Sequence, residues 1–372
     1  MEHMSAFSIF LFFIILLLLV IVHEFGHFIV AKWTNMRVDE FAFGFPPKLF
    51  SKKYGETEYS VNALPIGGFV SIWGENGSEE DKAKDGAKNN PRAFGNRPWW
   101  AQLLVLVAGV AMNMILALVI FIGISYGEVH ISVDDDVYGS RVKNPVLVVV
   151  DAVQESPAYK AGIVPGSIIT RVTAGGSEAN LATATSLIAF IGAHQNDSLT
   201  ISYKRTDGVI AKTTIASVYG IIPDKKAIGI SVDSIGVVKT NIWEAIKIGT
   251  EQTYYITKMT LQGLSDLVVS LGKGEDILAS LSGPVGIAKI VGQTSSYGVV
   301  SVLTLVSVLS INLAIFNILP LPALDGGRIV VVCIEAITRR KVPHKYYSWV
   351  NVIGFVALIV LLIVVTIHDV RG

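Results

Sequence analysis

Two histidines and a glutamate lie inside an apolar run near the start of the chain, LLLLVIVHEFGHFIVAKW, residues 16–33. His23 and His27 are four residues apart, so on an α-helix both imidazoles lie on one face and can reach the same metal ion. Glu24 follows about 100° around the helix, close to such an ion without having to ligate it. Charged groups at membrane depth cost at least about 2.5–3.5 kcal/mol on insertion scales, so these residues are read as functional.

The H-E-x-x-H pattern is typical of zinc-dependent peptide hydrolysis, in which the glutamate is the general base. A catalytic zinc takes three protein ligands and keeps one position for water, so another ligand must come from elsewhere in the chain. Asp325, in NILPLPALDGGRI, is the candidate because acids at membrane depth are rare in this sequence. Two structural alternatives remain: buried histidines bonded to a neighbouring helix, and an aspartate that caps a helix.

The residues beside Asp325 predict irregular backbone inside the membrane. Pro320 and Pro322 remove backbone donors and end a helix, which leaves extended chain with unpaired carbonyl groups. Gly326 and Gly327 are expected to let the chain turn tightly into a new helix. Such backbone is tolerated at membrane depth only where it is buried in protein or lines a wet cavity. An extended segment there could also pair with a substrate unwound into a strand.

Composition points to a membrane protein, because 51% of the 372 residues are hydrophobic, 16% are charged and the mean hydropathy is +0.55. A helix needs about 20 apolar residues to cross a bilayer. The first candidate is expected to be a retained helix rather than a signal peptide, because residues 1–22 contain no Lys or Arg and no small-x-small cleavage site follows. The candidate spans are residues 7–29, 100–124, 299–319 and 347–367.

Basic residues predict the orientation of the spans. Residues 30–98 carry ten Lys and Arg, and residues 320–345 carry five. Both connections are therefore expected to face the cytoplasm, with the long third connection and both termini outside. On this topology His23, His27 and Asp325 all fall near the cytoplasmic side, as a shared metal site requires.

Charge and cysteine content exclude some classes of protein. Lys plus Arg equals Asp plus Glu, 30 each, so bulk charge indicates no nucleic-acid partner. The single cysteine, Cys333, excludes an internal disulfide and a structural zinc held by thiolates.

The connection after the first span alternates apolar and polar residues, which predicts short strands and hairpins. Phe41, Phe43 and Phe45 alternate as on one face of a sheet. These rings either dip into the membrane interface or pack within a small β-subdomain. The polar stretch at residues 74–98 is predicted to be a mobile loop.

Residues 145–232 are predicted to form an independent outer domain. A buried strand, a short helix, a helical segment and a hairpin around Asp207 and Gly208 follow in that order. With AGIVPGSII, this order resembles a PDZ domain of the circularly permuted type found in bacterial membrane-linked proteases. A PDZ domain binds an extended segment or chain terminus at a sheet edge.

Ile228, Gly229 and Ile230 are the candidate carboxylate-binding loop of that domain; the alternative is that they only begin its last strand. The segment 233–297 that follows has helical spacing. Its helices are expected either to lie on the outer membrane face or to pack on the domain.

HEFGH in a first span, NILPLPALDGG in a third and a PDZ domain between spans two and three resemble the site-2 protease family. The match is to its bacterial RseP-type branch, which cleaves membrane-embedded anti-sigma factors and remnant signal peptides. SGPVGIAKI and FAFGFPP…LPIGGFV also resemble that branch. The resemblance implies zinc held by His23, His27 and Asp325, with Glu24 as base.

The same resemblance implies further roles. Asn317 is expected to hold the substrate or the developing oxyanion, although a polar contact between helices is the alternative. Asn113, in AGVAMN, is a candidate for handling substrate, and Val110 stands where the family motif has proline. LPIGGFV, with Gly67 and Gly68, is expected to guide substrate as an edge strand.

The expected fold is a polytopic α-helical membrane protein with four transmembrane helices, a membrane-associated β-hairpin region on the cytoplasmic side and one extracytoplasmic α+β PDZ domain. The expected divisions are 1–29 (first helix), 30–98 (β region and loop), 99–124 (second helix), 145–232 (PDZ domain), 233–297 (amphipathic linker), 298–327 (third segment) and 346–368 (fourth helix).

The expected function is hydrolysis of peptide bonds within transmembrane segments, in regulated intramembrane proteolysis at a bacterial inner membrane. Expected partners are single-span membrane proteins, the lipid bilayer and a peptide or protein terminus at the PDZ domain. The PDZ domain would also exclude substrates with large outer domains. A metal transporter would carry ionisable residues through several spans, yet spans two and four have none in their cores. A catalytically dead receptor would lack one of His23, Glu24, His27 and Asp325, and all four are present.

Overall fold

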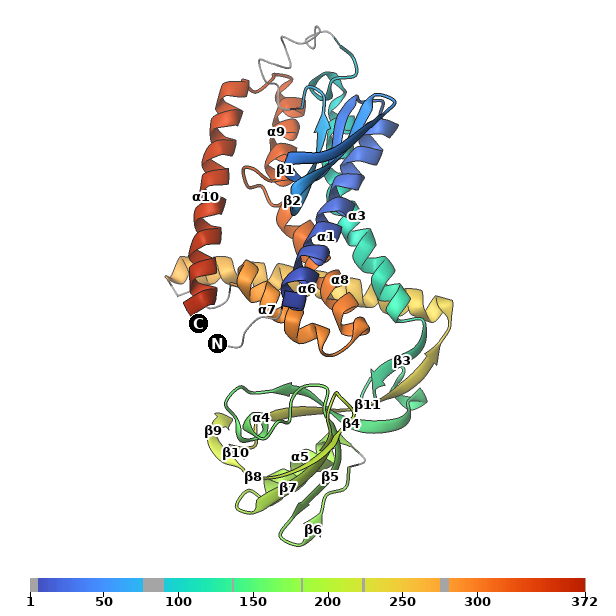
Figure 1. Cartoon of the computed structure of the whole chain (residues 1–372), viewed down its shortest axis with the longest axis vertical. Helices are drawn as coiled ribbons and strands as arrows, with labels where there is room; N and C mark the ends of the chain where they lie inside the picture. The colour runs from blue at the N-terminus through green and yellow to red at the C-terminus, as the bar shows by residue number, and fades with distance from the viewer. Residues whose placement is uncertain are drawn as a thin grey trace. The chain divides into compact units, whose positions relative to one another are not determined.

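The computed structural model divides the chain into two compact units, Ile124–Ile246 and the combination of Met1–Gly123 with Lys247–Gly372 (Figure 1). The larger unit holds the long apolar helices and a small sheet, and the other is mostly β. The prediction of several apolar helices combined with β structure is therefore confirmed. The described residues are 6–75, 90–135, 137–181, 183–222, 225–274 and 281–371.

Among the described residues, four helices are long and apolar enough to cross a membrane. Three of them contain a predicted span completely, and the helix at residues 299–318 ends one residue before its predicted span does. Large apolar side chains are exposed along nearly the whole of the last helix, which suits hydrocarbon rather than water. The four are α1 (Ala6–Trp33), α3 (Trp99–Ile124), α8 (Val299–Ile318) and α10 (His344–Arg371).

Apolar side chains on α1 pack against α7 (Pro284–Ser295) and α8, where Leu19, Val291 and Val306 are buried together. A Cβ added at Gly26 of α1 would clash with the backbone of α3 at Ala108. Small residues at such a crossing let two membrane helices approach closely, which replaces the hydrophobic driving force that lipid does not supply.

β1 (Val38–Tyr54) and β2 (Thr57–Ile72) form a sheet beside α1 (Figure 1). Each of the two long strands contributes two segments to this sheet. Residues 38–43 pair with 68–72 on one side and with 58–61 on the other, and 48–54 pair beyond them with 57–62. Residues 68–72 therefore lie at an edge of the described sheet.

Phe41 and Phe45 of β1 lie in different environments, whereas Phe43 between them is half-buried. Phe41 is buried and packs edge-on against Phe28 of α1, with ring centroids 5.2 Å apart. Phe45 is 42% exposed, and its neighbours Leu49 and Phe50 are more exposed still. Packing within the subdomain thus accounts for the first ring, and the exposed group remains suited to a membrane interface.

The turn between β1 and β2 is joined to the end of α1 by charge. Glu56 accepts two hydrogen bonds from the Arg92 guanidinium, at 2.6 and 2.7 Å, and one from Lys32 Nζ at 2.7 Å. The Arg92 hydrogen bonds, followed by those of Lys32, lower the pKa of the Glu56 carboxyl from 4.5 to about 2. The contact fixes the sheet to the helix that carries the histidines.

We expect Glu56→Gln to lower the thermal unfolding temperature at pH 7 by a few degrees. Because the folded-state pKa is depressed, the contribution of Glu56 is present above about pH 4.5 and is lost as the pH falls through about 2. The difference between variant and wild type should therefore shrink over that range in calorimetry. Glu251→Gln is the control, since its exposed pair with Lys247 at 3.9 Å is worth little. A difference independent of pH would contradict the assignment.

The β-rich unit is built on one sheet with strand order β3-β11-β4-β5-β7-β8, and β6 pairs with β5. The predicted hairpin around Asp207 and Gly208 joins β7 to β8. The core of the β-rich unit is apolar, with Leu147, Val172 and Leu199 buried. The strands are β3 (Gly127–Ser132), β4 (Lys143–Ala152), β5 (Ile168–Ala174), β6 (Ser177–Glu178), β7 (Ser198–Lys204), β8 (Ile210–Ala216) and β11 (Ile230–Thr240).

The compact unit is wider than the predicted domain, 145–232. β11 runs past residue 232, and its last residues pair with β3, which precedes residue 145. The segment 233–297 therefore begins as a strand rather than as a helical linker. The predicted boundary at residue 232 falls inside β11.

The remaining elements include one long helix after β11 and the helix that begins at Asp325. Residues 76–89, within the predicted loop 74–98, lie outside the described residues. These elements are η2 (Phe94–Asn96), η3 (Gly139–Arg141), α4 (Pro157–Lys160), α5 (Ala184–Ala193), β9 (Val218–Ile222), β10 (Lys225–Ala227), α6 (Ile242–Lys273) and α9 (Asp325–Thr338).

Candidate metal centre

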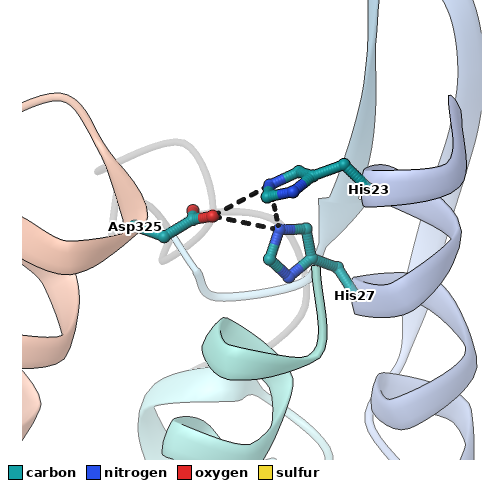
Figure 2. A group of neighbouring side chains, drawn as sticks. All are labelled: His23, His27 and Asp325. Carbon is teal, nitrogen blue, oxygen red and sulfur yellow. Dashed lines mark hydrogen bonds and ion pairs between the residues drawn. The ribbon is translucent and has the colours of Figure 1, made fainter. Parts of the chain in front are cut away.

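His23 and His27 project from α1 towards Asp325, the first residue of α9 (Figure 2). His23 Nε2 lies 2.9 Å from Asp325 Oδ2, and His27 Nε2 lies 3.4 Å from the same oxygen. The two Nε2 atoms are 3.1 Å apart. One ligand atom from each residue thus lies within 4.8 Å of the others. Two nitrogens and one carboxylate oxygen are a donor set that suits zinc.

The ring of His27 is oriented from behind by α3. Its Nδ1 donates to the Val105 carbonyl at 2.8 Å, which leaves the lone pair of Nε2 directed at the centre. A hydrogen bond from the outer ring nitrogen to a carbonyl is the usual support for a metal-ligating histidine.

The ring of His23 meets Asn113, also on α3. The Asn113 amide nitrogen lies 3.4 Å from His23 Nδ1, and the Asn113 side-chain oxygen is buried without a partner. Turning this amide by 180° would let the oxygen accept from Nδ1–H, which pairs both groups and directs Nε2 of His23 at the centre. Asn113 is fully buried and does not line the cavity beside the centre, so its position favours orienting His23 over touching substrate.

Gly109 lies on α3 midway between Val105 and Asn113. A Cβ added there would come 2.5 Å from His27 Nε2 and 2.7 Å from His23 Cε1. Any larger residue would therefore push both imidazoles away from Asp325. The sequence offered a signal in the motif AGVAMN, but the role of the glycine was not recognised.

Irregular chain after α8 brings Asp325 to the histidines. Ala323 takes a left-handed conformation, with φ 68°, and its N–H donates to Asn351 Oδ1 of α10 at 3.2 Å. The turn was expected at Gly326 and Gly327, and this expectation is wrong, because both lie in the first turn of α9. Their lack of a Cβ matters instead because the carbonyls of Ile318 and Leu319 pass directly against Gly326, and that of Leu321 against Gly327.

The position of Asp325 also bears on the capping alternative. Its carboxylate bonds to His23 rather than to a backbone amide of α9, and the N-cap residue is Leu324, which makes no side-chain cap. The negative charge at the start of a helix is still favoured by the helix dipole.

A cavity of about 250 Å³ opens beside the centre. Glu24 lines it next to His23, and Asn317 lines it with its amide nitrogen 3.4 Å from His23 Nε2. The complete lining is Val20, His23, Glu24, Leu313, Asn317, Ala323, Leu324 and Asp325.

The edge of the β1–β2 sheet runs past the same cavity. A Cβ added at Gly68 would lie 3.8 Å from Glu24 Cγ, so the backbone of this strand passes close to the glutamate. Gly67 lies against the ring of Phe45, where a Cβ would come within 2.6 Å. Gly68 thus keeps a side chain out of the space between the edge and α1, and Gly67 leaves room for the Phe45 ring.

The predicted PDZ loop lies in the other unit. The Gly229 carbonyl accepts from Val153 N at 2.9 Å, and the Ile228 carbonyl accepts from Ala158 N at 3.1 Å. Gly229 is left-handed, with φ 84°. Ile230 begins β11. These contacts hold the loop on the turn before α4, and binding of a carboxylate there stays a prediction.

Sequence reasoning missed an ion pair that holds α9. Arg328, three residues after Asp325, pairs through both terminal nitrogens with the side chain and backbone carbonyl of Glu75. The two side chains are 17% and 16% exposed, and the guanidinium lies 5.1 Å from the ring centroid of Phe94. The sequence shows a single cation, Arg328, early in an apolar helix, but nothing in it indicates that the partner is Glu75, 253 residues away.

We expect Gly109→Ala to weaken zinc binding by at least about tenfold, the loss typical when the support of a ligand is disturbed. Competition with a chelator measures this. Gly123→Ala is the matched control on the same helix, because a Cβ there meets nothing within 4 Å. Equal zinc affinity in the two variants would mean that the close approach at Gly109 does not matter.

We expect Arg328→Met to destabilise the protein by about 3 kcal/mol, because it leaves the mostly buried Glu75 unpaired. Adding Glu75→Gln should recover much of that loss, since neither charge then remains. Denaturant unfolding in detergent tests both variants, with Lys52→Gln as a surface control. Additive losses in the double variant would contradict the pairing.

A helix of membrane length that carries two buried histidines and a glutamate, with an aspartate brought against the histidines from the start of α9, is the arrangement expected of a membrane metalloprotease. Residues 11–361 match Peptidase family M50. The chain belongs to this family, the site-2 proteases, as the resemblance in its motifs predicted.

Curated relatives agree over nearly full length. A "putative zinc metalloprotease" of Clostridium acetobutylicum is 33% identical over 369 residues, covering 99% of this chain and 98% of the relative. A protein of the same description from Clostridium perfringens is 34% identical over 353 residues, 95% of each chain. The zinc metalloprotease RasP of Geobacillus kaustophilus is 28% identical over 438 residues, 98% of each. The protein is thus a zinc metalloprotease.

Proposed function

We propose that the protein is an intramembrane zinc metalloprotease that hydrolyses peptide bonds within transmembrane segments of other membrane proteins. The observation that carries this is the approach of His23 and His27, inside the apolar helix α1, to within 4.8 Å of Asp325 at the start of α9. These three side chains would hold the zinc, and Glu24 would be the base.

The donor set supports zinc on chemical grounds. Both histidines present Nε2, a carboxylate oxygen faces them, and Val105 and Asn113 lie behind the rings. The cavity of about 250 Å³ leaves one side of the centre open. When bound, zinc polarises a carbonyl group and lowers the pKa of water towards about 7.

The residues of the cavity supply the proton transfers. Glu24 takes a proton from the attacking water and returns it to the nitrogen of the leaving amine. Asn317, on the same cavity, can donate its amide hydrogen to the carbonyl oxygen as negative charge develops there. Asn113 has no contact with substrate in this scheme and holds His23 in position.

The substrate must be unwound, because carbonyls in a helix are hydrogen-bonded and shielded. The sheet edge at residues 68–72 passes Glu24 and can accept an extended segment as a further strand. Gly67 and Gly68 leave room for its side chains. The edge strand is therefore proposed to deliver the scissile bond to the cavity.

The finer topology is part of the proposal. The helices α1, α3, α8 and α10 cross a bacterial inner membrane, with the sheet on the cytoplasmic side. The unit Ile124–Ile246 contains a PDZ domain outside the cell membrane, and residues 228–230 bind a peptide or chain terminus there. Substrates are single-span proteins of the anti-sigma-factor or remnant-signal-peptide type, cleaved in regulated intramembrane proteolysis. The charge distribution and the family resemblance support this orientation.

Glu24→Gln should keep zinc and lose cleavage by at least about 10²-fold, because the carboxylate that moves the proton is gone while the three ligands remain. His27→Ala should lose both. The measurements are hydrolysis of a synthetic membrane-spanning peptide in detergent and zinc content by mass spectrometry. A fully active Glu24→Gln, or purified wild type without metal, would overturn the assignment.

A further inference from the structure

A second cavity, of about 280 Å³, lies apart from the metal centre, where α3 begins and α9 ends. It shares no lining residue with the cavity beside the histidines. Most of its polar lining is basic. The residues that matter here are Arg97, Trp99, Glu335, Arg339, Arg340 and Lys341.

The charges around this cavity do not cancel. Lys341 pairs with Glu335 at 3.3 Å. Among the described residues, the Arg97 guanidinium donates to the backbone carbonyls of Pro91 and Thr34, and its Nε is buried with no hydrogen-bond partner. Within the described ranges, no carboxylate lies within 4.0 Å of Arg339 or Arg340. Four cations and one carboxylate leave a net charge of +3.

The cavity lies at the start of one apolar helix, α3, and its last lining residue, Lys341, comes shortly before another, α10. Trp99 and Trp100 begin α3 and are 54% and 49% exposed, and tryptophan at the end of a span favours the level of the lipid headgroups. α10 begins at His344, three residues after Lys341. Below the basic rim, the exposed apolar faces of these helices offer a surface for acyl chains.

Arg339 occupies a position that usually takes glycine. It is the C-cap of α9 in a left-handed conformation, with φ 55°. An arginine there carries a conformational cost that glycine would not. The same geometry makes Arg339→Gly a clean test, because it removes the charge without straining the backbone.

We propose that this cavity binds the phosphate headgroup of an anionic phospholipid. Arg97, Arg339 and Arg340 would contact the phosphate, and the acyl chains would lie along α3 and α10. Basic pockets between membrane helices bind such headgroups. A phospholipid fits better than a soluble phosphate ester because the charge adjoins tryptophan and apolar helices rather than a polar surface.

Thermal unfolding of the purified full chain in a neutral detergent tests the proposal. Phosphatidylglycerol should raise the unfolding temperature, whereas phosphatidylcholine and soluble glycerol-1-phosphate at equal concentration should not. Each basic side chain near an anionic lipid is worth about a fivefold change in affinity, so Arg339→Gly with Arg340→Gln should raise the phosphatidylglycerol concentration needed for the same response by about 25-fold. Lipid retained in native mass spectrometry should fall in parallel.

The control variant, Lys204→Gln with Lys212→Gln, removes two exposed charges from the β-rich unit and should respond as wild type does. An unchanged lipid response in the arginine variant would overturn the proposal. An equal response to phosphatidylcholine or to glycerol-1-phosphate would also overturn it. None of these readouts uses cleavage, so they stand apart from the test of Glu24.

Discussion

Polar ligand atoms at membrane depth must each find a partner inside the protein, because lipid supplies none. This constraint organises the structure around His23 and His27. Asp325 faces their inner nitrogens, and Val105 and Asn113 meet the outer ones. The helix α3 and the irregular chain before Asp325 therefore supply the hydrogen-bond partners of His23 and His27. The same arrangement directs the unshared electron pairs of both rings to one point, which is what a metal needs.

Satisfying those atoms requires backbones to come unusually close. Gly26 and Gly109 allow α1 and α3 to meet where the imidazoles lie, and the start of α9 packs against carbonyls just before it. Membrane helices have little hydrophobic reason to associate, so contact of this kind depends on small residues and on hydrogen bonds. Glycine is thus needed at these positions because neighbouring backbones and rings come too close for a Cβ, rather than because the chain turns there.

Charge holds the surrounding elements in register. Glu56 joins the turn of the β1–β2 sheet to the end of α1, and the pair of Glu75 with Arg328 joins the end of β2 to α9. The sheet is therefore fixed to both elements that carry metal ligands. The edge strand of the same sheet passes close to Glu24 at Gly68. The sheet edge and the group of His23, His27 and Asp325 are therefore attached to the same helices.

The sequence by itself determined the parts of the molecule that follow from local pattern. The i, i+4 spacing of His23 and His27, the long apolar runs and the turn residues Asp207 and Gly208 specify local structure through side chains a few residues apart. The acid at Asp325 was identified because a membrane sequence contains so few.

Only the tertiary structure decided which distant groups meet. It placed Asp325 against His23 across 302 residues of sequence separation, put Asn113 behind the ring and paired Glu75 with Arg328. It also carried the β-rich unit beyond residue 232, since β3 is stabilised by pairing with the far end of β11. Such contacts depend on how whole helices and strands pack, and no pattern of neighbouring residues records that.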